Sequence, residues 1–358
     1  MKICSVILAG GGGTRFWPLS RQNMPKQLLN ISGNDIMINE TINRCTGVIP
    51  LDGTYIVTNS SQAEILGKVL HLDVPRENVL TEPYGRNTSA CIAYAAVVLQ
   101  KKYGDAVMVV LPSDHYISNE RAFREILVKA CNLAEASGKL VTIGIKPTFP
   151  STGYGYINYD LGSYDPPKGG YEVLEFVEKP DYPKAKKYVE SGSYLWNSGM
   201  FVWTVSAILE SFERYLPRIY KGVMELCHWL GTEKEAETLE RIYSKMPGVS
   251  IDYGIMERSD DVLVIPGDFG WNDVGSWDAL GAIFPTDTEG NIVKAKHIGI
   301  NTQNSIIYSS DRLIATIDVN GIIIADAGDA LLVCPKNNAQ DVKKLVEFLK
   351  EQGMKEYI

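Results

Sequence analysis

The feature that most constrains the fold is an apolar run near the N-terminus that passes directly into four glycines. Residues 3–9 are almost continuously apolar, and residues 10–13 are all glycine. An apolar run of this length is typical of a strand buried on both faces of a parallel sheet. Glycines let backbone N–H groups approach a phosphate chain without clashes from Cβ atoms. The chain is therefore expected to begin with a buried strand and a phosphate-binding loop.

Short apolar runs alternate with helical patterns as far as residue 145. Further strands are expected at residues 55–58, 107–111 and 140–145. One helix is expected over residues 86–103, with Gly104 as its stop, and another between an N-cap at Ser118 and an end at Gly138. This alternation predicts βαβ units and a doubly wound, Rossmann-like, mostly parallel α/β sheet.

The pattern changes twice in the rest of the chain. Shorter strands (154–159 and 173–177) alternate with helices to about residue 278, and residues 284–290 have the composition of a linker. Beyond them, short β-branched runs extend to residue 333 and precede an amphipathic helix over residues 339–350. We predict one domain over residues 1–285, with parts at about 1–150 and 151–285. A small C-terminal β unit with a terminal helix follows over residues 286–358.

Charge and cysteine usage exclude several classes of protein. The net charge is -8 and the pI about 5.2, whereas proteins that bind nucleic acid usually carry a basic face. The six cysteines are scattered and form no C-x-x-C pair, which argues against a disulfide scaffold and a cysteine zinc site. The first apolar run is too short for a signal peptide, and no stretch is long enough to span a bilayer. We expect a cytoplasmic protein without a nucleic-acid or membrane partner.

The glycine loop does not fit two common nucleotide-binding motifs. A P-loop needs G-K-[S/T] after its second glycine, and a dinucleotide fingerprint needs G-x-G-x-x-G at the start of a helix. Here Arg15 and the Phe16-Trp17-Pro18 segment interrupt the second pattern, so an NAD-dependent dehydrogenase is excluded. A tight surface turn remains the alternative. Arg15 and Lys26 follow the loop, and such cations can neutralise charge during phosphate transfer.

Two aspartates are candidates for a metal ion. Asp114 follows the apolar run 107–111, at the edge where α/β sheets bind ligands, and Mg²⁺ usually takes one or two carboxylates plus substrate phosphates. A helix N-cap is the alternative role for Asp114. Asp273 lies among small, polar and aromatic residues that suit the wall of a polar site, and Asp268 is an alternative to it. The lone His115 is interpreted as a structural residue, not a zinc ligand.

Polar residues in the second half of the chain suit a sugar phosphate. Glu178 and Lys179 end a predicted strand and would point to opposite faces if that strand continued, although such a pair is often a solvated edge. Lysine suits a phosphate, and glutamate accepts hydrogen bonds from hydroxyls. Asn197 and Asp252 lie in segments of polar and aromatic residues, and Gly155 can bring backbone groups against a ring.

These segments together resemble the sugar-nucleotide pyrophosphorylases. The signature spans residues 8–20 and 25–27, and the likeness extends over nearly the whole chain. Residues 81–88, Thr-Glu-Pro-Tyr-Gly-Arg-Asn-Thr, resemble the guanylyltransferase branch, whereas thymidylyl relatives carry a Gln-containing loop there. The resemblance implies a nucleotide-diphospho-sugar transferase fold with a short C-terminal β-helix-like unit. It also implies a Mg²⁺-dependent (or Mn²⁺-dependent) reaction of GTP with mannose 1-phosphate that yields GDP-mannose and diphosphate.

The resemblance assigns roles to individual residues. Nucleotide contacts are implied for Gly10, Gly11, Gly13, Thr14, Glu82, Arg86 and Asn87, metal ligation for Asp114 and Asp273, and sugar-phosphate contacts for Gly155, Glu178, Lys179, Asn197 and Asp252. The implied catalytic residues are Arg15, Lys26, Asp114 and Lys179. A homodimer is also implied. Longer bacterial relatives continue into an isomerase domain, and since this chain stops at Ile358 we expect no isomerase activity.

Two alternatives remain open. One is a related enzyme that joins glucose 1-phosphate to UTP or dTTP. The other is a regulatory homologue that binds nucleotide sugars without turnover, although the retention of Arg15, Lys26 and Asp114 argues against it.

Overall fold

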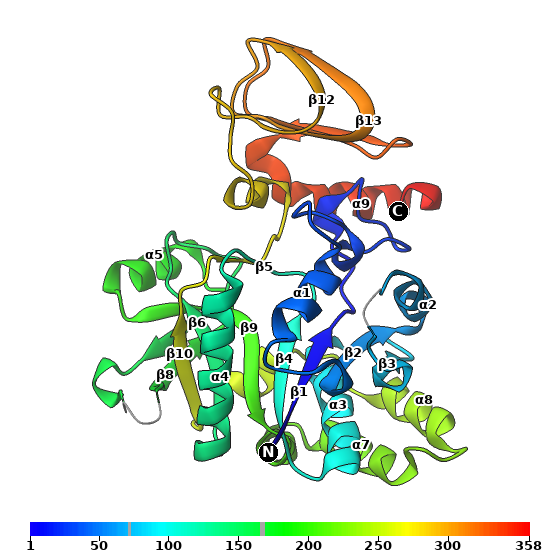
Figure 1. The fold of residues 1–358 in the computed structure, drawn as a ribbon, viewed down its shortest axis with the longest axis vertical. Helices are drawn as coiled ribbons and strands as arrows, with labels where there is room; N and C mark the ends of the chain where they lie inside the picture. The colour runs from blue at the N-terminus through cyan, green and yellow to red at the C-terminus, as the bar shows by residue number, and fades with distance from the viewer. Residues whose placement is uncertain (71–72, 165–168) are drawn as a thin grey trace. The chain divides into compact units, whose positions relative to one another are not determined.

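The computed structural model describes residues 1–70, 73–164 and 169–358 and divides into two compact units (Figure 1). The first unit comprises residues 1–10, 42–113 and 119–269. The second unit comprises residues 11–41, 114–118 and 270–358. Each unit is therefore built from separate stretches of the chain. The predicted domain boundary at residue 285 remains a prediction.

A nine-stranded sheet organises the first unit, in the order β3-β2-β1-β4-β9-β6-β10-β8-β7. Its strands are β1 (Lys2–Leu8), β2 (Thr54–Asn59), β3 (Val79–Glu82), β4 (Ala106–Pro112), β6 (Leu140–Ile145), β7 (Tyr156–Tyr159), β8 (Tyr171–Val177), β9 (Tyr194–Thr204) and β10 (Val262–Gly267). β1 pairs in parallel with β2 and β4, whereas β9 runs antiparallel to β4 and β6. The predicted, mostly parallel α/β sheet is confirmed for its N-terminal half, and the antiparallel strands lie in the later part.

Helices cover the sheet of the first unit and bury its apolar residues. They are α2 (Ser60–Val69), α3 (Asn87–Tyr103), α4 (Glu120–Ser137), α5 (Tyr182–Ser191), α6 (Val205–Tyr215), α7 (Pro217–Trp229) and α8 (Glu235–Lys245). Helix α1 (Met37–Cys45) begins in the second unit and ends in the first. α3 packs against α6 and α7, and α4 packs against β6, β9 and β10 (Figure 1). The large core includes fully buried side chains such as Trp203 and Phe212.

Helix ends follow the local chemistry, with one difference from the prediction. Gly104 and Gly138 adopt positive φ values of 75° and 67° and end α3 and α4 as predicted. The predicted N-cap of α4 at Ser118 is wrong, because Asn119 takes that place and its side-chain oxygen accepts the N–H of Ala122. Both residue types are good caps, and the one whose oxygen reaches that N–H sets the start of the helix.

The second unit carries a stacked β structure. β12 (Ile292–Ile300), β13 (Ile306–Ile317), β14 (Ile322–Asp326) and β15 (Leu331–Pro335) form a four-stranded sheet in chain order. β12, β13 and β14 pair in parallel, and β15 is antiparallel to β14, so the expected β-helix-like unit is confirmed. The unit also contains the short pair β5 (Tyr116–Ile117) and β11 (Trp271–Asn272), together with α9 (Val342–Glu351).

Within the described parts of the chain, no helix combines the length and the apolar character that crossing a membrane requires.

Candidate active site

The glycine loop of the second unit is folded closely over Lys26. Gly13 has φ 58° and ψ 33°, in the left-handed region, and precedes the 3-10 helix η1 (Thr14–Phe16). A Cβ placed on Gly13 would lie 2.2 Å from Cβ of Lys26. Only glycine fits this position, because both the backbone conformation and the space exclude a side chain.

Lys26 joins three separate stretches of the second unit. Its side chain is almost fully buried, and its Nζ donates to the backbone oxygen and to Oδ2 of Asp114, both at 2.9 Å. The same Nζ donates to the backbone oxygen of Asp273 at 2.7 Å. An ammonium group has three N–H donors, and these acceptors match that number. The structure thus brings the predicted lysine together with both predicted aspartates.

The carboxylate of Asp114 is held in its charged form. Burial alone would raise the pKa of this carboxyl, but the attraction of Lys26 and His115 and the hydrogen bonds to the carboxylate together outweigh burial and lower the pKa below its ordinary value. About a third of the side chain remains exposed. Asp114 lies between β4 and β5 and caps no helix, so the alternative role as an N-cap is wrong. The carboxylate is ionised at neutral pH and accessible to a ligand.

Asp273, Asp268 and His115 were the other residues considered for the metal site, and their surroundings differ. Oδ2 of Asp273 would lie 2.8 Å from a Cβ on Gly275, so the carboxylate folds back over that glycine. Asp268 is exposed and belongs to the first unit. His115 accepts a hydrogen bond at Nδ1 from the indole nitrogen of Trp271 at 3.1 Å, which agrees with a structural role.

The donor set suits a hard cation that shares its coordination with substrate. Among the residues that the structure describes, no group of three or more His, Cys, Asp or Glu side chains could hold a metal ion. Asp114 and Asp273 offer oxygen atoms only, and Mg²⁺ commonly takes one or two carboxylates and completes its shell with phosphates and water. The residues therefore fit Mg²⁺ and do not fit a closed zinc site.

Aromatic residues pack against the glycine loop and Lys26. Phe16 and Trp277 lie 5.3 Å apart between ring centroids, and the Lys26 Nζ lies 5.9 Å from the Phe16 centroid. Trp277 donates its indole N–H to the backbone oxygen of Trp17 at 3.0 Å. Arg15 lies between the buried Phe16 and Gly13 and is itself exposed. Sequence reasoning missed this supporting role, although the aromatic residues stand inside the motifs that it singled out.

A buried carboxylate ends β3 in the first unit. The Glu82 side chain is almost fully buried, and its Oε2 would lie 4.0 Å from a Cβ on Gly10. The thiol of Cys91 donates to Oε2 at 3.1 Å, whereas Oε1 has no hydrogen-bond partner among the described residues. Burial raises the pKa of Glu82. An unpaired buried carboxylate oxygen costs stability, so this one is a candidate for contact with a ligand.

Arg86 and Asn87 shape the turn that follows Glu82. The Nε and one terminal nitrogen of Arg86 donate to the backbone oxygens of Tyr243 and Ser244, at 2.8 and 2.9 Å. Asn87 has φ 64° and accepts the N–H of Thr88 at its side-chain oxygen. The guanidinium of Arg86 thus attaches the turn to the end of α8.

Glu178 and Lys179 lie just beyond β8 and contact one another. β8 ends at Val177, and Lys179 has φ 49°, which turns the chain out of the extended conformation. The strand does not continue to these residues, so the condition under which their side chains would point to opposite faces is not met. The Lys179 Nζ lies 2.7 Å from Oε1 of Glu178, and 8% of the Glu178 side chain is exposed against 56% of the Lys179 side chain, so the glutamate is buried and the lysine is solvated.

The remaining sugar-side residues gather around Glu178 in the first unit. Asn197, on β9, donates its amide N–H to Oδ1 of Asp252 at 2.8 Å. A Cβ on Gly155 would lie 2.5 Å from Oε2 of Glu178 and 3.2 Å from Cβ of Asn197. All five residues that sequence reasoning grouped, Gly155, Glu178, Lys179, Asn197 and Asp252, thus belong to one cluster.

The cluster contains buried acids that can accept hydrogen bonds from hydroxyl groups. Burial and then the nearby Asp252 raise the pKa of Glu178, and burial raises the pKa of Asp252. Oε2 of Glu178 has no hydrogen-bond partner within the described part of the chain. Sequence reasoning missed Glu257, whose Oε1 accepts the backbone N–H of Glu178 at 2.7 Å. The only available signal was that Glu257 closes the segment that contains Asp252.

Comparisons with known proteins cover nearly the whole chain. Residues 4–290 match the family described as nucleotidyl transferase, and residues 295–349 match the MannoseP isomerase/GMP-like beta-helix domain. A mannose-1-phosphate guanylyltransferase of Escherichia coli (strain K12) is 38% identical over 99% of this chain and 75% of the relative. The xanthan biosynthesis protein XanB of Xanthomonas campestris pv. campestris (strain ATCC 33913) is 39% identical over 99% of this chain and 74% of that protein.

Solved structures give a similar result. A crystal structure named mannose-1-phosphate geranyltransferase, from Thermus thermophilus, is 33% identical with a TM-score of 0.88. That similarity covers 98% of this chain and 100% of the other. The fold of nearly the whole chain and the C-terminal β-helix domain are therefore features that this chain shares with known proteins.

Proposed function

The chain belongs to the nucleotidyl transferase family, and from that premise we propose that it is a mannose-1-phosphate guanylyltransferase. The reaction joins GTP to α-D-mannose 1-phosphate and gives GDP-mannose and diphosphate. The observation that carries the proposal is the contact of one buried ammonium, on Lys26, with both Asp114 and Asp273. Lys26 pairs with the carboxylate of Asp114 and holds the segment of Asp273 by its backbone oxygen. Transfer between polyphosphates needs such a cation beside an acid, since charge must be neutralised and a metal must be held.

We assign the metal ion to Asp114 and Asp273, with Mg²⁺ as the ion and Mn²⁺ as a substitute. When bound, the ion supplies positive charge to the triphosphate and helps diphosphate to leave. Asp273 is preferred over Asp268 because its segment shares Lys26 with Asp114. The lowered pKa of Asp114 keeps this ligand ionised at neutral pH.

The proposed reaction is an in-line displacement. An oxygen of the sugar phosphate forms a bond to the α-phosphorus of GTP, and the bond to the bridging oxygen breaks, so that diphosphate leaves with the electron pair. The nucleophile is already an anion, and no general base is needed. The work of the protein is to align two anions that repel each other and to neutralise their charge. We assign the triphosphate to Arg15, Lys26 and the loop at Gly11, Gly13 and Thr14.

The choice of base rests on Glu82. Guanine presents two neighbouring N–H donors on its Watson–Crick edge, and a carboxylate can accept from both. Uracil and thymine present a carbonyl oxygen in place of the second donor, which a buried carboxylate would repel. An unpaired, buried oxygen of Glu82 near Gly10 therefore supports GTP. Arg86 and Asn87 shape the loop that carries this contact.

The sugar phosphate is assigned to the cluster in the first unit. Lys179 supplies a point charge for the phosphate, and Glu178, Asn197 and Asp252 supply acceptors and a donor for hydroxyls. Gly155 leaves open the space in which a side chain would collide with Glu178. Glu178 and Lys179 are attached to the same short turn, so binding of the phosphate at Lys179 also positions Glu178.

A panel of substrates tests the proposal. GTP, UTP and dTTP are each combined with mannose 1-phosphate or glucose 1-phosphate, and diphosphate release is measured with Mg²⁺. The highest kcat/KM is expected for GTP with mannose 1-phosphate. A clear preference for UTP or dTTP with glucose 1-phosphate would support the related transferase instead. If no pair of substrates gives diphosphate release, the result would support the regulatory homologue.

A single substitution tests whether Glu82 selects guanine over uracil. Glu82→Gln replaces one acceptor oxygen by an amide donor of similar size. The ratio of kcat/KM for GTP to that for UTP should fall at least tenfold, a change of about 1.4 kcal/mol. An unchanged ratio would show that Glu82 does not read the base, whereas the substrate panel would still decide the activity.

We propose also that the protein acts as a homodimer in the cytoplasm. The resemblance to the family supports the dimer, and the six cysteines, all free of disulfides, suit a reducing compartment. Sedimentation velocity at micromolar concentration should give twice the mass of one chain, and a monomer would contradict this assignment.

A further inference from the structure

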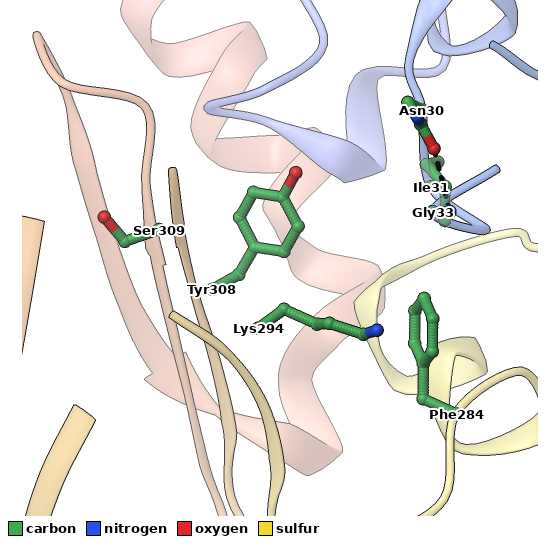
Figure 2. Close-up of a pocket in the computed structure, with 7 residues that line it drawn as sticks. All are labelled: Asn30, Ile31, Gly33, Phe284, Lys294, Tyr308 and Ser309. Atoms are coloured by element: carbon green, nitrogen blue, oxygen red, sulfur yellow. Dashed lines mark hydrogen bonds between the residues drawn. The ribbon is translucent and has the colours of Figure 1, made fainter. Parts of the chain in front are cut away.

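A cavity in the second unit lies beside β12 and β13 and contains none of the residues assigned to the active site. Its volume is about 300 Å³, and its lining includes Asn30, Phe284, Lys294 and Tyr308 (Figure 2). This volume is at the lower end of the range for pockets that hold small ligands. A ligand of the size of a phosphorylated monosaccharide would fit it.

Lys294 supplies a positive charge to this cavity. It pairs in register with Tyr308 across β12 and β13, and both side chains extend into the same space (Figure 2). Its Nζ lies 3.8 Å from the ring centroid of Phe284. Lys294 makes no ion pair with any residue that the structure describes. The ring stabilises the ammonium without neutralising it, so an anion can still bind.

Two neutral donors stand with this cation. Neither the hydroxyl of Tyr308 nor the amide nitrogen of Asn30 hydrogen bonds to another residue in the described ranges. Asn30 uses only its side-chain oxygen, which accepts the N–H of Gly33 at 2.8 Å. Burial raises the pKa of Tyr308, so its hydroxyl stays protonated and able to donate at neutral pH.

The acid that is hydrogen bonded to the lining residue Ser309 is already engaged. Asp326 is buried, and its Oδ2 accepts from Ser309 at 2.9 Å and lies 3.5 Å from Nε of Arg312. The Ser309 side chain points away from the cavity (Figure 2). The charge of Asp326 is therefore balanced by Arg312, and the charge of Lys294 remains available to a ligand.

We propose that this cavity binds a small phosphate monoester, with its anionic oxygens at Lys294, Tyr308 and Asn30. Three donors, one of them charged, match the three terminal oxygens of a phosphate monoester better than the two oxygens of a carboxylate. The ring of Phe284 offers an apolar wall to the rest of the ligand. The inference goes beyond the proposed function and does not depend on it, because no residue assigned to GTP or mannose 1-phosphate lines the cavity.

Calorimetric titration of the full chain with glucose 6-phosphate tests the proposal. Glucose is the uncharged control, and no nucleotide is present. Lys294→Gln removes the charge and keeps the length of the side chain, and Lys294→Arg retains the charge. Lys296→Gln is the matched control, since Lys296 is an exposed lysine two residues further along β12 and does not line the cavity.

The expected result is binding of glucose 6-phosphate at millimolar concentration and no binding of glucose. Lys294→Gln should weaken that binding at least tenfold, whereas Lys296→Gln and Lys294→Arg should stay within threefold of the parent. The proposal is overturned if the parent does not bind glucose 6-phosphate. It is also overturned if Lys294→Gln gives the same isotherm as the parent, which would locate the binding elsewhere.

Discussion

Substitution of Gly13 by alanine tests whether the glycine loop positions Lys26. The left-handed conformation of Gly13 disfavours any residue with a Cβ. The new methyl group would lie 2.2 Å from Cβ of Lys26, whereas ordinary contacts begin at 3.4 Å. The loop and Lys26 must therefore separate by about 1.2 Å, the difference between these two distances.

The size of the effect follows from these two causes. The left-handed conformation costs about 1–2 kcal/mol for a residue with a Cβ, and relief of the overlap costs about 1–3 kcal/mol. We therefore expect Gly13→Ala to lower the free energy of unfolding by about 2–5 kcal/mol. Misplacement of a positioned group by about 1 Å can reduce turnover about 100-fold, so turnover should fall by a factor on that order.

The assay compares Gly13 with Gly138, because both have a positive φ but only Gly13 has atoms close to the position of a Cβ. Gly138 has φ 67°, close to the 58° of Gly13, yet a Cβ there meets no atom within 4 Å. Gly138→Ala should lose about 1–2 kcal/mol of stability in urea and keep the parent rate of diphosphate release. The reasoning is refuted if Gly13→Ala is folded, turns over within twofold of the parent, and is destabilised no more than Gly138→Ala.

Four further predictions concern the assigned residues and the metal. Lys26→Ala and Asp114→Ala should each lower the rate of diphosphate release at least tenfold, about 1.4 kcal/mol of barrier, and parent-like turnover of the folded variants would rule out these roles. Removal of divalent cations with EDTA should abolish turnover and added Mg²⁺ should restore it, so that activity in EDTA would contradict the metal assignment. Lys179→Ala should raise the KM for mannose 1-phosphate at least tenfold, and a defect confined to GTP would contradict that assignment. Burial raises the pKa of Glu82 above its ordinary value of 4.5, so the native carboxyl holds its proton more firmly than the unfolded one and stability falls as the pH rises past that value. Glu82→Gln should therefore be more stable than the parent at pH 7.5 in urea, with a gap that narrows towards pH 4, and a less stable variant at pH 7.5 would contradict this prediction.

Local pattern was sufficient to predict much of the fold. The apolar runs at β1, β4 and β6 were visible because a strand buried on both faces needs no help from distant residues to be recognised. Gly104 and Gly138 marked helix ends because a left-handed residue is needed there. The α4 cap was missed because Ser118 and Asn119 are both good caps, and only the geometry chooses between them.

Local sequence pattern does not predict the contacts between distant segments that form the site. Lys26, Asp114 and Asp273 were singled out by their motifs, but their shared hydrogen bonds depend on folding of distant segments. Lys179 adopts a positive φ that nothing in its residue type indicates, so the end of β8 before Glu178 and Lys179 could not be predicted from the sequence. The grouping of residues 11–41 and 114–118 with the C-terminal residues was also invisible, because it arises from tertiary contacts alone.

The hydrogen bond from Lys26 to Asp273 spans 247 residues of sequence. During synthesis from the N-terminus, the lysine emerges from the ribosome long before the carbonyl that holds it. A nascent chain released before residue 273 would therefore lack one of the three acceptors that the ammonium of Lys26 uses in the folded protein. The site can be completed only after residue 273 has been synthesised, and termination before that residue would leave a chain that cannot complete it, however well its first strands have formed.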